Sequence, residues 1–171
     1  AGLEIVETNA VLTNTSVLKN HVKFQIGCQG GGIYSTSSAL STYGGQIERN
    51  SECGGIKCYL SDCNFTSTRI RFNSVGYIGG AFTIQESSLH LYDTLVENNT
   101  ASIAGGGIFG YSANSAQSTS IKIYSSTIRY NKVSSGAFNT YDGGGGINIR
   151  YRVSLFISMS SIHSNTANVC G

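Results

Sequence analysis

One short pattern recurs six times along this chain: an apolar residue, two variable residues and an asparagine. The apolar residues are Val17, Ile47, Ile70, Val96, Ile128 and Ile162, and the asparagines are Asn20, Asn50, Asn73, Asn99, Asn131 and Asn165. Successive asparagines are 30, 23, 26, 32 and 34 residues apart. Repeats of this length are typical of solenoids and propellers, in which each repeat is one small structural unit.

The residues around each pattern predict strands, because apolar residues alternate with polar ones in pairs such as Leu89/Leu91 and Ile121/Ile123. Glycine clusters that lead into an apolar residue separate the copies, at residues 30–34, 54–58, 79–83, 105–110 and 143–149. Unequal units of short strands and turns describe the coils of a parallel β-helix. We therefore expect an all-β protein, a right-handed parallel β-helix (β-solenoid) of about six coils that forms a single domain over residues 1–171.

Stacking of such coils would align the six apolar residues in one inward column and the six asparagines in a ladder beside it. An asparagine amide can donate to and accept from its copies at the strand spacing of roughly 4.8 Å. Asparagine also tolerates the left-handed backbone conformation, so we expect the ladder residues to occupy it at a turn. Residues 111–120 and 132–142 are expected to be loops at one corner. These asparagines are interpreted as structural residues, not ligands.

Composition excludes two classes of partner. The net charge is only +2 and basic residues do not cluster, which argues against nucleic-acid binding. No apolar run approaches the roughly 20 residues of a membrane helix, so membrane insertion is not expected. The chain has no proline, which suits a backbone that donates hydrogen bonds along its whole length.

A catalytic site is not expected, because the nine acidic residues do not gather on neighbouring coils as an acid/base pair or calcium cage would require. Glu48 and Glu97 are expected to be offset from each other in the repeat, and His21, His90 and His163 fall in distant units. We predict no catalytic, cofactor-binding or metal-binding residues. Tyrosines share one repeat position in three units and favour a packing ladder over a sugar-binding row: Tyr43, Tyr92 and Tyr124.

The five cysteines and three glycosylation sequons favour a secreted or cell-surface protein. Candidate disulfides are Cys28–Cys53 and Cys58–Cys63, which leaves Cys170 either free or bonded to another chain. Candidate sites for N-glycans are Asn14, Asn64 and Asn98.

The alternation of glycine–glycine–apolar and apolar-x-x-Asn elements resembles the repeats of polymorphic outer-membrane protein passengers of chlamydiae. It is also similar to extracellular right-handed β-helix repeat proteins more widely. The family's GGAI element is best matched by residues 79–82, Gly-Gly-Ala-Phe, whereas Val or Ile replaces the Phe of its Phe-x-x-Asn element. The resemblance covers nearly the whole chain. It implies a right-handed β-helix and an extracellular, passenger-type binding module.

The repeat also continues in phase from the last residues of one chain to the first residues of another. Across that join, Leu3 falls nine residues after Asn165, as Ile108 falls nine after Asn99, and Asn20 falls 26 residues after Asn165. We therefore expect a structural subunit that assembles head-to-tail with copies of itself into an extracellular fibre. Its interface would contain Ala1, Gly2, Leu3, Ile5, Asn165, Val169, Cys170 and Gly171. The alternatives are an adhesin-type module that binds glycans or surface proteins and, more weakly supported, a carbohydrate-active enzyme.

Overall fold

The computed structural model describes residues 1–22, 30–134 and 143–168. The regular secondary structure within these ranges consists of β-strands alone, and the strands of each sheet pair in parallel. The chain passes through the sheets in rotation, so that strands adjacent in a sheet come from successive repeats. The expected all-β parallel solenoid is therefore confirmed.

Four sheets build the solenoid. The first contains β1 (Leu3–Val6), β4 (Ile33–Thr36), β7 (Ile56–Tyr59), β11 (Phe82–Gln85), β15 (Ile108–Tyr111) and β19 (Ile147–Arg150). The second contains β2 (Asn9–Thr13), β5 (Ala39–Tyr43), β8 (Asp62–Thr66), β12 (Ser88–Tyr92), β16 (Thr119–Tyr124) and β20 (Val153–Ser158). The third contains β3 (Ser16–Leu18), β6 (Gln46–Glu48), β9 (Arg69–Arg71), β13 (Leu95–Glu97), β17 (Thr127–Arg129) and β21 (Ser161–His163). The short fourth sheet contains β10 (Ser74–Val75), β14 (Thr100–Ala101), β18 (Lys132–Val133) and β22 (Thr166–Ala167).

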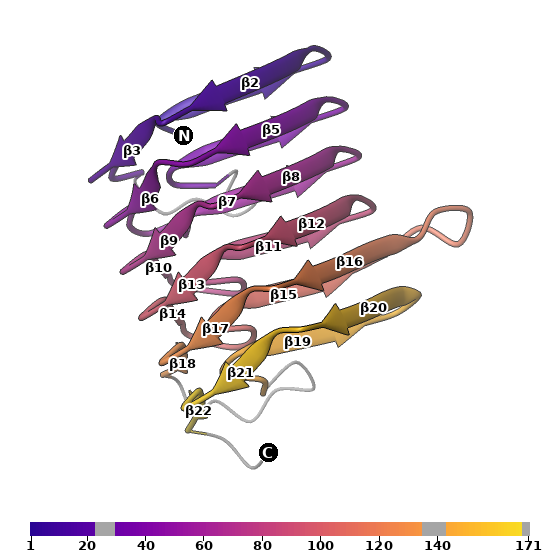
Figure 1. The fold of residues 1–171 in the computed structure, drawn as a ribbon. Helices are drawn as coiled ribbons and strands as arrows, with labels where there is room; N and C mark the ends of the chain where they lie inside the picture. Colours follow the sequence, from indigo (N-terminus) through magenta and orange to yellow (C-terminus); the bar gives the residue numbers. More distant parts are fainter. Residues whose placement is uncertain (23–29, 135–142, 169–171) are drawn as a thin grey trace.

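The coils lie one above another as a stack whose first coil is at one end and whose last coil is at the other (Figure 1). Three of the sheets have six strands each, so six coils are joined by five steps and the described chain makes about five turns. We call the bend between the first and second sheets the first corner. The second corner joins the second and third sheets, and the third corner joins the third and fourth sheets.

The apolar residue of each repeat pairs in register with its copies in the third sheet, from Val17 to Ile162. The members of this column from Val17 to Ile128 are buried among the inward residues of the other sheets. Ile162 departs from the expected buried column because its side chain is 42% exposed. It lies on the last coil, where no following coil of the described chain covers it.

All three corners contain residues with a left-handed backbone. At the third corner the φ angles of these residues lie between 54° and 57°, and the residues are Lys19, Arg49, Phe72, Asn98, Tyr130 and Ser164. Each of them immediately precedes a ladder asparagine. The prediction that the ladder asparagines themselves adopt this conformation is therefore wrong. A left-handed residue costs about 1 kcal/mol, and the bend that it makes turns the following asparagine side chain inward.

The two longer insertions lie at different places, so the expectation of one shared corner is wrong. Residues 112–118 leave the stack at the first corner, between β15 and β16, and form the loop that projects furthest in Figure 1. The second insertion follows β18 and leads to β19, and its residues 135–142 lie outside the described residues. Both insertions keep the strands on either side in register with the neighbouring coils.

Candidate functional site

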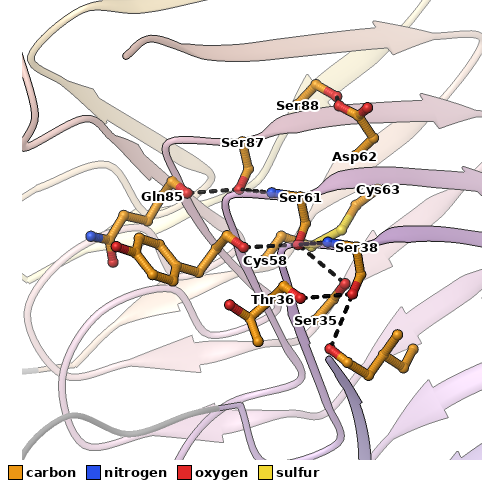
Figure 2. The surroundings of a disulfide bond; sticks show 12 residues. Ser35, Thr36, Ser38, Cys58, Ser61, Asp62, Cys63, Gln85, Ser87 and Ser88 are labelled. Atoms are coloured by element: carbon orange, nitrogen blue, oxygen red, sulfur yellow. Dashed lines mark hydrogen bonds between the residues drawn. A yellow bond between two sulfur atoms is a disulfide. The ribbon is translucent and has the colours of Figure 1, made fainter. Parts of the chain in front are cut away.

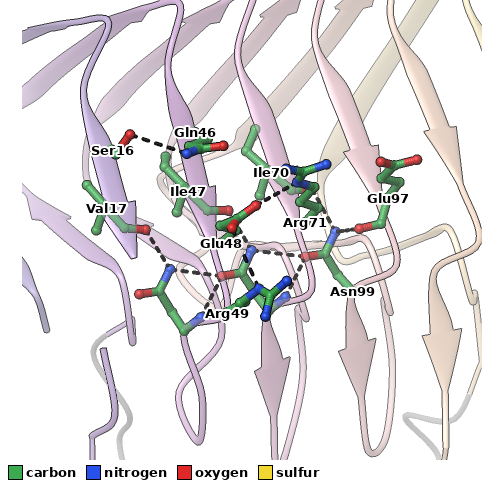
Figure 3. A network of polar contacts seen from close by, with 12 residues as sticks. Ser16, Val17, Gln46, Ile47, Glu48, Arg49, Ile70, Arg71, Glu97 and Asn99 are labelled. Carbon is green, nitrogen blue, oxygen red and sulfur yellow. Dashed lines mark hydrogen bonds and ion pairs between the residues drawn. The ribbon is translucent and has the colours of Figure 1, made fainter. Parts of the chain in front are cut away.

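The six repeat asparagines form a continuous hydrogen-bonded column at the third corner. Each Nδ2 donates to the Oδ1 of the next asparagine over 2.9–3.0 Å, from Asn20 through to Asn165. Each Oδ1 also accepts the preceding asparagine's backbone N–H, and Nδ2 reaches the carbonyl of the apolar residue one coil earlier. Figure 3 shows Asn99 in this arrangement beside Ile70 and Glu97. Buried amides satisfied in this way hold successive coils in one register.

The last coil presents an apolar face that the other coils bury. Ile149, Ile157 and Ile162 are 40–42% exposed, whereas Ile123 and Ile128, one coil earlier, are fully buried. At the opposite end of the stack, Ile5 and Val17 of the first coil are buried. Exposed apolar core positions within the described residues are thus concentrated on the last coil.

We call this surface the end face. It forms a shallow hollow of about 480 Å³. It is lined by Gly146, Ile147, Ile149, Leu155, Ile157, Ile162, His163, Ser164 and Asn165. Among the strands that the structure describes, β19, β20 and β21 around this hollow each pair on one side only, as do β1, β2 and β3 at the other end. The unpaired N–H and C=O groups of such edge strands are a template for a further strand.

The residues expected at a subunit interface that the structure describes lie at both ends of the solenoid. Ala1, Gly2, Leu3 and Ile5 belong to the first coil, and Leu3 and Ile5 pair with Ile33 and Ser35 of the second. Asn165 lies on the end face. Val169, Cys170 and Gly171 lie outside the described residues. Within one copy the first coil and the last coil, which carries Asn165, lie at opposite ends of the stack (Figure 1).

Acidic residues in the repeat are paired with arginines on the outer surface of the third sheet. Glu48 and Glu97 occupy the same column with Arg71 between them, so the expectation that they are offset is wrong. Arg71 Nε donates to Glu48 Oε2 over 2.6 Å (Figure 3). Arg129 pairs with Glu97 over 2.9 Å. Nowhere in residues 1–22, 30–134 and 143–168 do three His, Cys, Asp or Glu side chains gather as metal ligands would.

The three tyrosines do occupy one column of the second sheet, with Thr66 between Tyr43 and Tyr92. The rings of Tyr92 and Tyr124 stack face to face, with centroids 5.0 Å apart and planes within 2°. Stacked rings cover the faces that a sugar would need, which favours the packing interpretation. His21, His90 and His163 lie on the first, fourth and sixth coils. The Nδ1 atoms of His21 and His163 lie 2.9 and 3.1 Å from the hydroxyls of Ser51 and Ser164.

Burial shifts the pKa of three outward-facing groups in the described part of the chain. It lowers the pKa of Lys57, whose ammonium lies 6.0 Å from the centre of the Tyr34 ring. It also lowers the pKa of His90, with the charge of Lys122 adding to the effect and that of Asp62 opposing it. Burial raises the pKa of Tyr111 to about 12, and Glu86 adds to this effect. The Tyr111 hydroxyl donates to Gln85 Oε1 over 2.6 Å.

The predicted Cys58–Cys63 disulfide is confirmed, and it joins β7 to β8 inside the first corner. Such a bond is typical of proteins in oxidising compartments. The other candidate pair includes Cys28, which lies outside the described residues, so it stays a prediction. Of the sequon asparagines, Asn14 is exposed, and Asn64 and Asn98 are half-buried.

Two further ladders, made of hydroxyl groups, were not predicted from the sequence. At the first corner the backbone N–H of Ser38 donates to Ser61 Oγ, and that of Ser61 donates to Ser87 Oγ (Figure 2). At the second corner Thr94 and Ser126 donate in the same way to the next coil. The signal was present, because Thr68, Thr94, Ser126 and Ser160 all lie two residues before the repeat's apolar residue.

Parallel coils, corner ladders and a stacked apolar core define this chain as a parallel β-solenoid. No family model matches the sequence, and no curated protein or solved structure is significantly similar to it. No helix in the described ranges could span a membrane.

Proposed function

We propose that this protein is a structural β-solenoid subunit that extends into a fibre when copies stack head-to-tail. The observation that supports the proposal is the end face, on which Ile149, Ile157 and Ile162 continue the core columns and remain exposed. An apolar surface of this kind, surrounded by unpaired strand edges, is a site for adding a further coil. A second copy of the chain is the occupant to which we commit.

The first coil of a second copy carries the side chains that would extend each column. In the register of the existing coils, its Leu3 and Ile5 would stack on Ile147 and Ile149. Its Val17 would stack on Ile162, as Ile47 stacks on Val17 within the chain. Because the two surfaces differ, the contact is heterologous and does not close on itself, which generates a filament.

The asparagine ladder would continue through the same contact. Asn165 already accepts from Asn131, and its amide donates to Ile128 O. In the next copy, Asn20 Oδ1 would accept from the N–H and Nδ2 of Asn165, and Asn20 Nδ2 would reach Ile162 O. A misaligned copy would leave these polar groups unpaired, so the ladder favours one register.

We further propose that assembly takes place outside the cell. The Cys58–Cys63 disulfide and the repeats that resemble passenger domains support this location. N-glycans on Asn14, Asn64 or Asn98 would be compatible with stacking, because none of these is a ladder asparagine. The alternative function, an adhesin-type module that binds glycans or surface proteins, is supported by a polar groove along the first corner.

Two variants of β20 test the assembly. Ile157 faces the end of the stack, whereas Phe156 beside it is 51% exposed on the outer surface of the second sheet. The variant Ile157→Lys should abolish fibres in negative-stain electron microscopy and elute as a monomer, because a charge would be buried at each contact. The matched variant Phe156→Lys should form fibres of normal length.

A deletion probes the other surface of the contact. Removal of residues 1–6 takes away β1 and should leave a folded monomer that does not polymerise. Fibres of normal length from this deletion or from Ile157→Lys would refute stacking through the end face. A wild-type chain that stays monomeric at high concentration would show that another segment or partner is the occupant.

A further inference from the structure

A polar groove follows the first corner parallel to the solenoid axis. Its volume is about 790 Å³, and its walls come from the first five coils. It is lined by Asn9, Ser37, Ser38, Ala39, Leu60, Ser61, Asp62, Glu86, Ser87, Ser88, Gln117, Ser118 and Ser120. Seven of these residues are serines and two are side-chain amides, so hydroxyl and amide groups dominate the surface.

The floor of the groove is held in place by covalent and hydrogen bonds. Ser38, Ser61 and Ser87 form the hydroxyl ladder of the first corner, and each Oγ also donates to the carbonyl two residues earlier. The Cys58–Cys63 disulfide spans this corner from the inside, next to Ser61 (Figure 2). A surface fixed in this way loses little conformational entropy when a ligand binds.

The loop of residues 112–118 borders the groove at the fifth coil. The backbone N–H of Asn114 donates to Glu86 Oε1 over 2.9 Å, which ties the loop to the groove. Arg152 donates to the carbonyl of Ser115 from the next coil. Gln117 and Ser118 of this loop face the groove and extend its polar lining.

The charges on the lining restrict the chemistry of a ligand. Asp62 and Glu86 are the charged lining residues, and no basic side chain lines the groove. Two carboxylates disfavour anionic ligands such as phosphates and uronic-acid chains. Both carboxylates also accept internal hydrogen bonds, from Ser88 and Asn114, which reduces their capacity to pair with a cation. A neutral ligand rich in hydroxyl groups matches the remaining donors and acceptors.

We propose that this groove binds a neutral, extended glycan along the solenoid axis. Equivalent polar groups recur on four of the five coils that line the groove, with Ala39 on the second coil. The coils are spaced by roughly 4.8 Å, which is close to the length of one sugar unit in an extended chain. Outward positions at the start of successive second-sheet strands supply this row, including Asp62, Ser88 and Ser120. Leu60 provides an apolar contact for a sugar ring. The site lies on the side of the stack and does not depend on head-to-tail assembly.

Isothermal titration calorimetry on the full chain tests the proposal with hexasaccharides. The neutral probes are cellohexaose, chitohexaose, mannohexaose and maltohexaose, and the charged probes are hexagalacturonate and spermine. At least one neutral probe should bind with a dissociation constant below about 1 mM. Absence of binding by all four neutral probes, or tighter binding of a charged probe, would overturn the proposal.

Two arginine variants on β5 locate the site. Ala39 faces outward into the groove, whereas Ser41 faces outward on the same strand and is not part of the lining. Ala39→Arg should weaken glycan binding at least tenfold, because the new side chain occupies the groove. Ser41→Arg should change it less than twofold, and both variants should keep the wild-type circular dichroism spectrum. Equal binding by Ala39→Arg and wild type would contradict the assignment.

Discussion

Ile128 and Ile162 are chemically identical members of one column, yet their surroundings differ completely. Ile128 has no exposed surface because coils lie on both sides of it, whereas Ile162 is 42% exposed on the end face. The free energy that an isoleucine contributes depends on the area it removes from water. Position along the stack therefore determines how strongly each copy of the repeat stabilises the fold.

The same substitution at these two positions should have unequal effects. Ile128→Asp would place a carboxylate in the core without a partner and should lower the free energy of unfolding by about 4 kcal/mol. Ile162→Asp leaves the carboxylate in contact with water and should cost less than about 1 kcal/mol. Urea denaturation of dilute monomer measures both values. Equal losses would contradict the burial described here.

Tyr111 makes stability depend on pH in the alkaline range. Its pKa in the folded protein is raised to about 12, chiefly by burial, from an ordinary value of 10.0. The folded state therefore retains a proton that the unfolded state releases, so the stabilisation is complete below pH 10.0 and is lost as the pH rises towards 12. Denaturation of wild type and Tyr111→Phe between these pH values should show a shallower decline in the variant. Parallel declines would rule out this contribution.

At the scale of the elements, corners are as important as strands. The strands have only two to six residues, so the chain must bend repeatedly. Left-handed residues make the bends, and side-chain ladders of Ser, Thr or Asn satisfy the inward backbone groups. Gly32 illustrates the tight packing that results, because a Cβ there would lie 2.8 Å from Asn50 Nδ2.

The disulfide between β7 and β8 should stabilise the first corner. It closes a loop over a sequence separation of 5 residues, and chain entropy for so short a loop predicts a contribution of about 2 kcal/mol. Replacement of both Cys58 and Cys63 with Ala should lower the free energy of unfolding by at least about this amount, since buried volume is also lost. Guanidinium denaturation provides the measurement. An unchanged midpoint would mean that the hydroxyl ladder alone holds the corner.

The whole molecule has a direction, because the core residues Ile5 and Val17 of the first coil are buried whereas Ile149, Ile157 and Ile162 of the last coil are exposed. Such polarity suits addition of copies in one orientation and is the basis of the proposed fibre. Each copy contributes six coils to a stack, and a coil rises by roughly 4.8 Å. The axial rise per copy should therefore be about 29 Å.

Cryo-electron microscopy of fibres measures this rise directly. A rise near 29 Å, together with parallel strands perpendicular to the axis, would support continuous stacking of the coils. A much longer rise would indicate that copies meet through loops instead of strands. A fibre whose strands run along its axis would contradict stacking through the end face.

The sequence by itself was sufficient to predict the parallel solenoid, the alignment of its repeats and the Cys58–Cys63 bond. These features follow from local spacing, because every coil repeats the same order of apolar residues, glycines and asparagines. The alignment of Leu89 with Ile121, for example, is the pairing of β12 with β16.

Only the tertiary structure decided what each repeated position contacts. Left-handed residues precede the ladder asparagines because the bend must occur before the side chain can point inward. Glu48 and Glu97 pair with arginines because register places Arg71 and Arg129 beside them. The groove and the end face depend on which side chains from different coils lie side by side and on which lack a covering coil. A one-dimensional pattern records the spacing of residues along the chain, whereas burial and complementarity arise from neighbours across it.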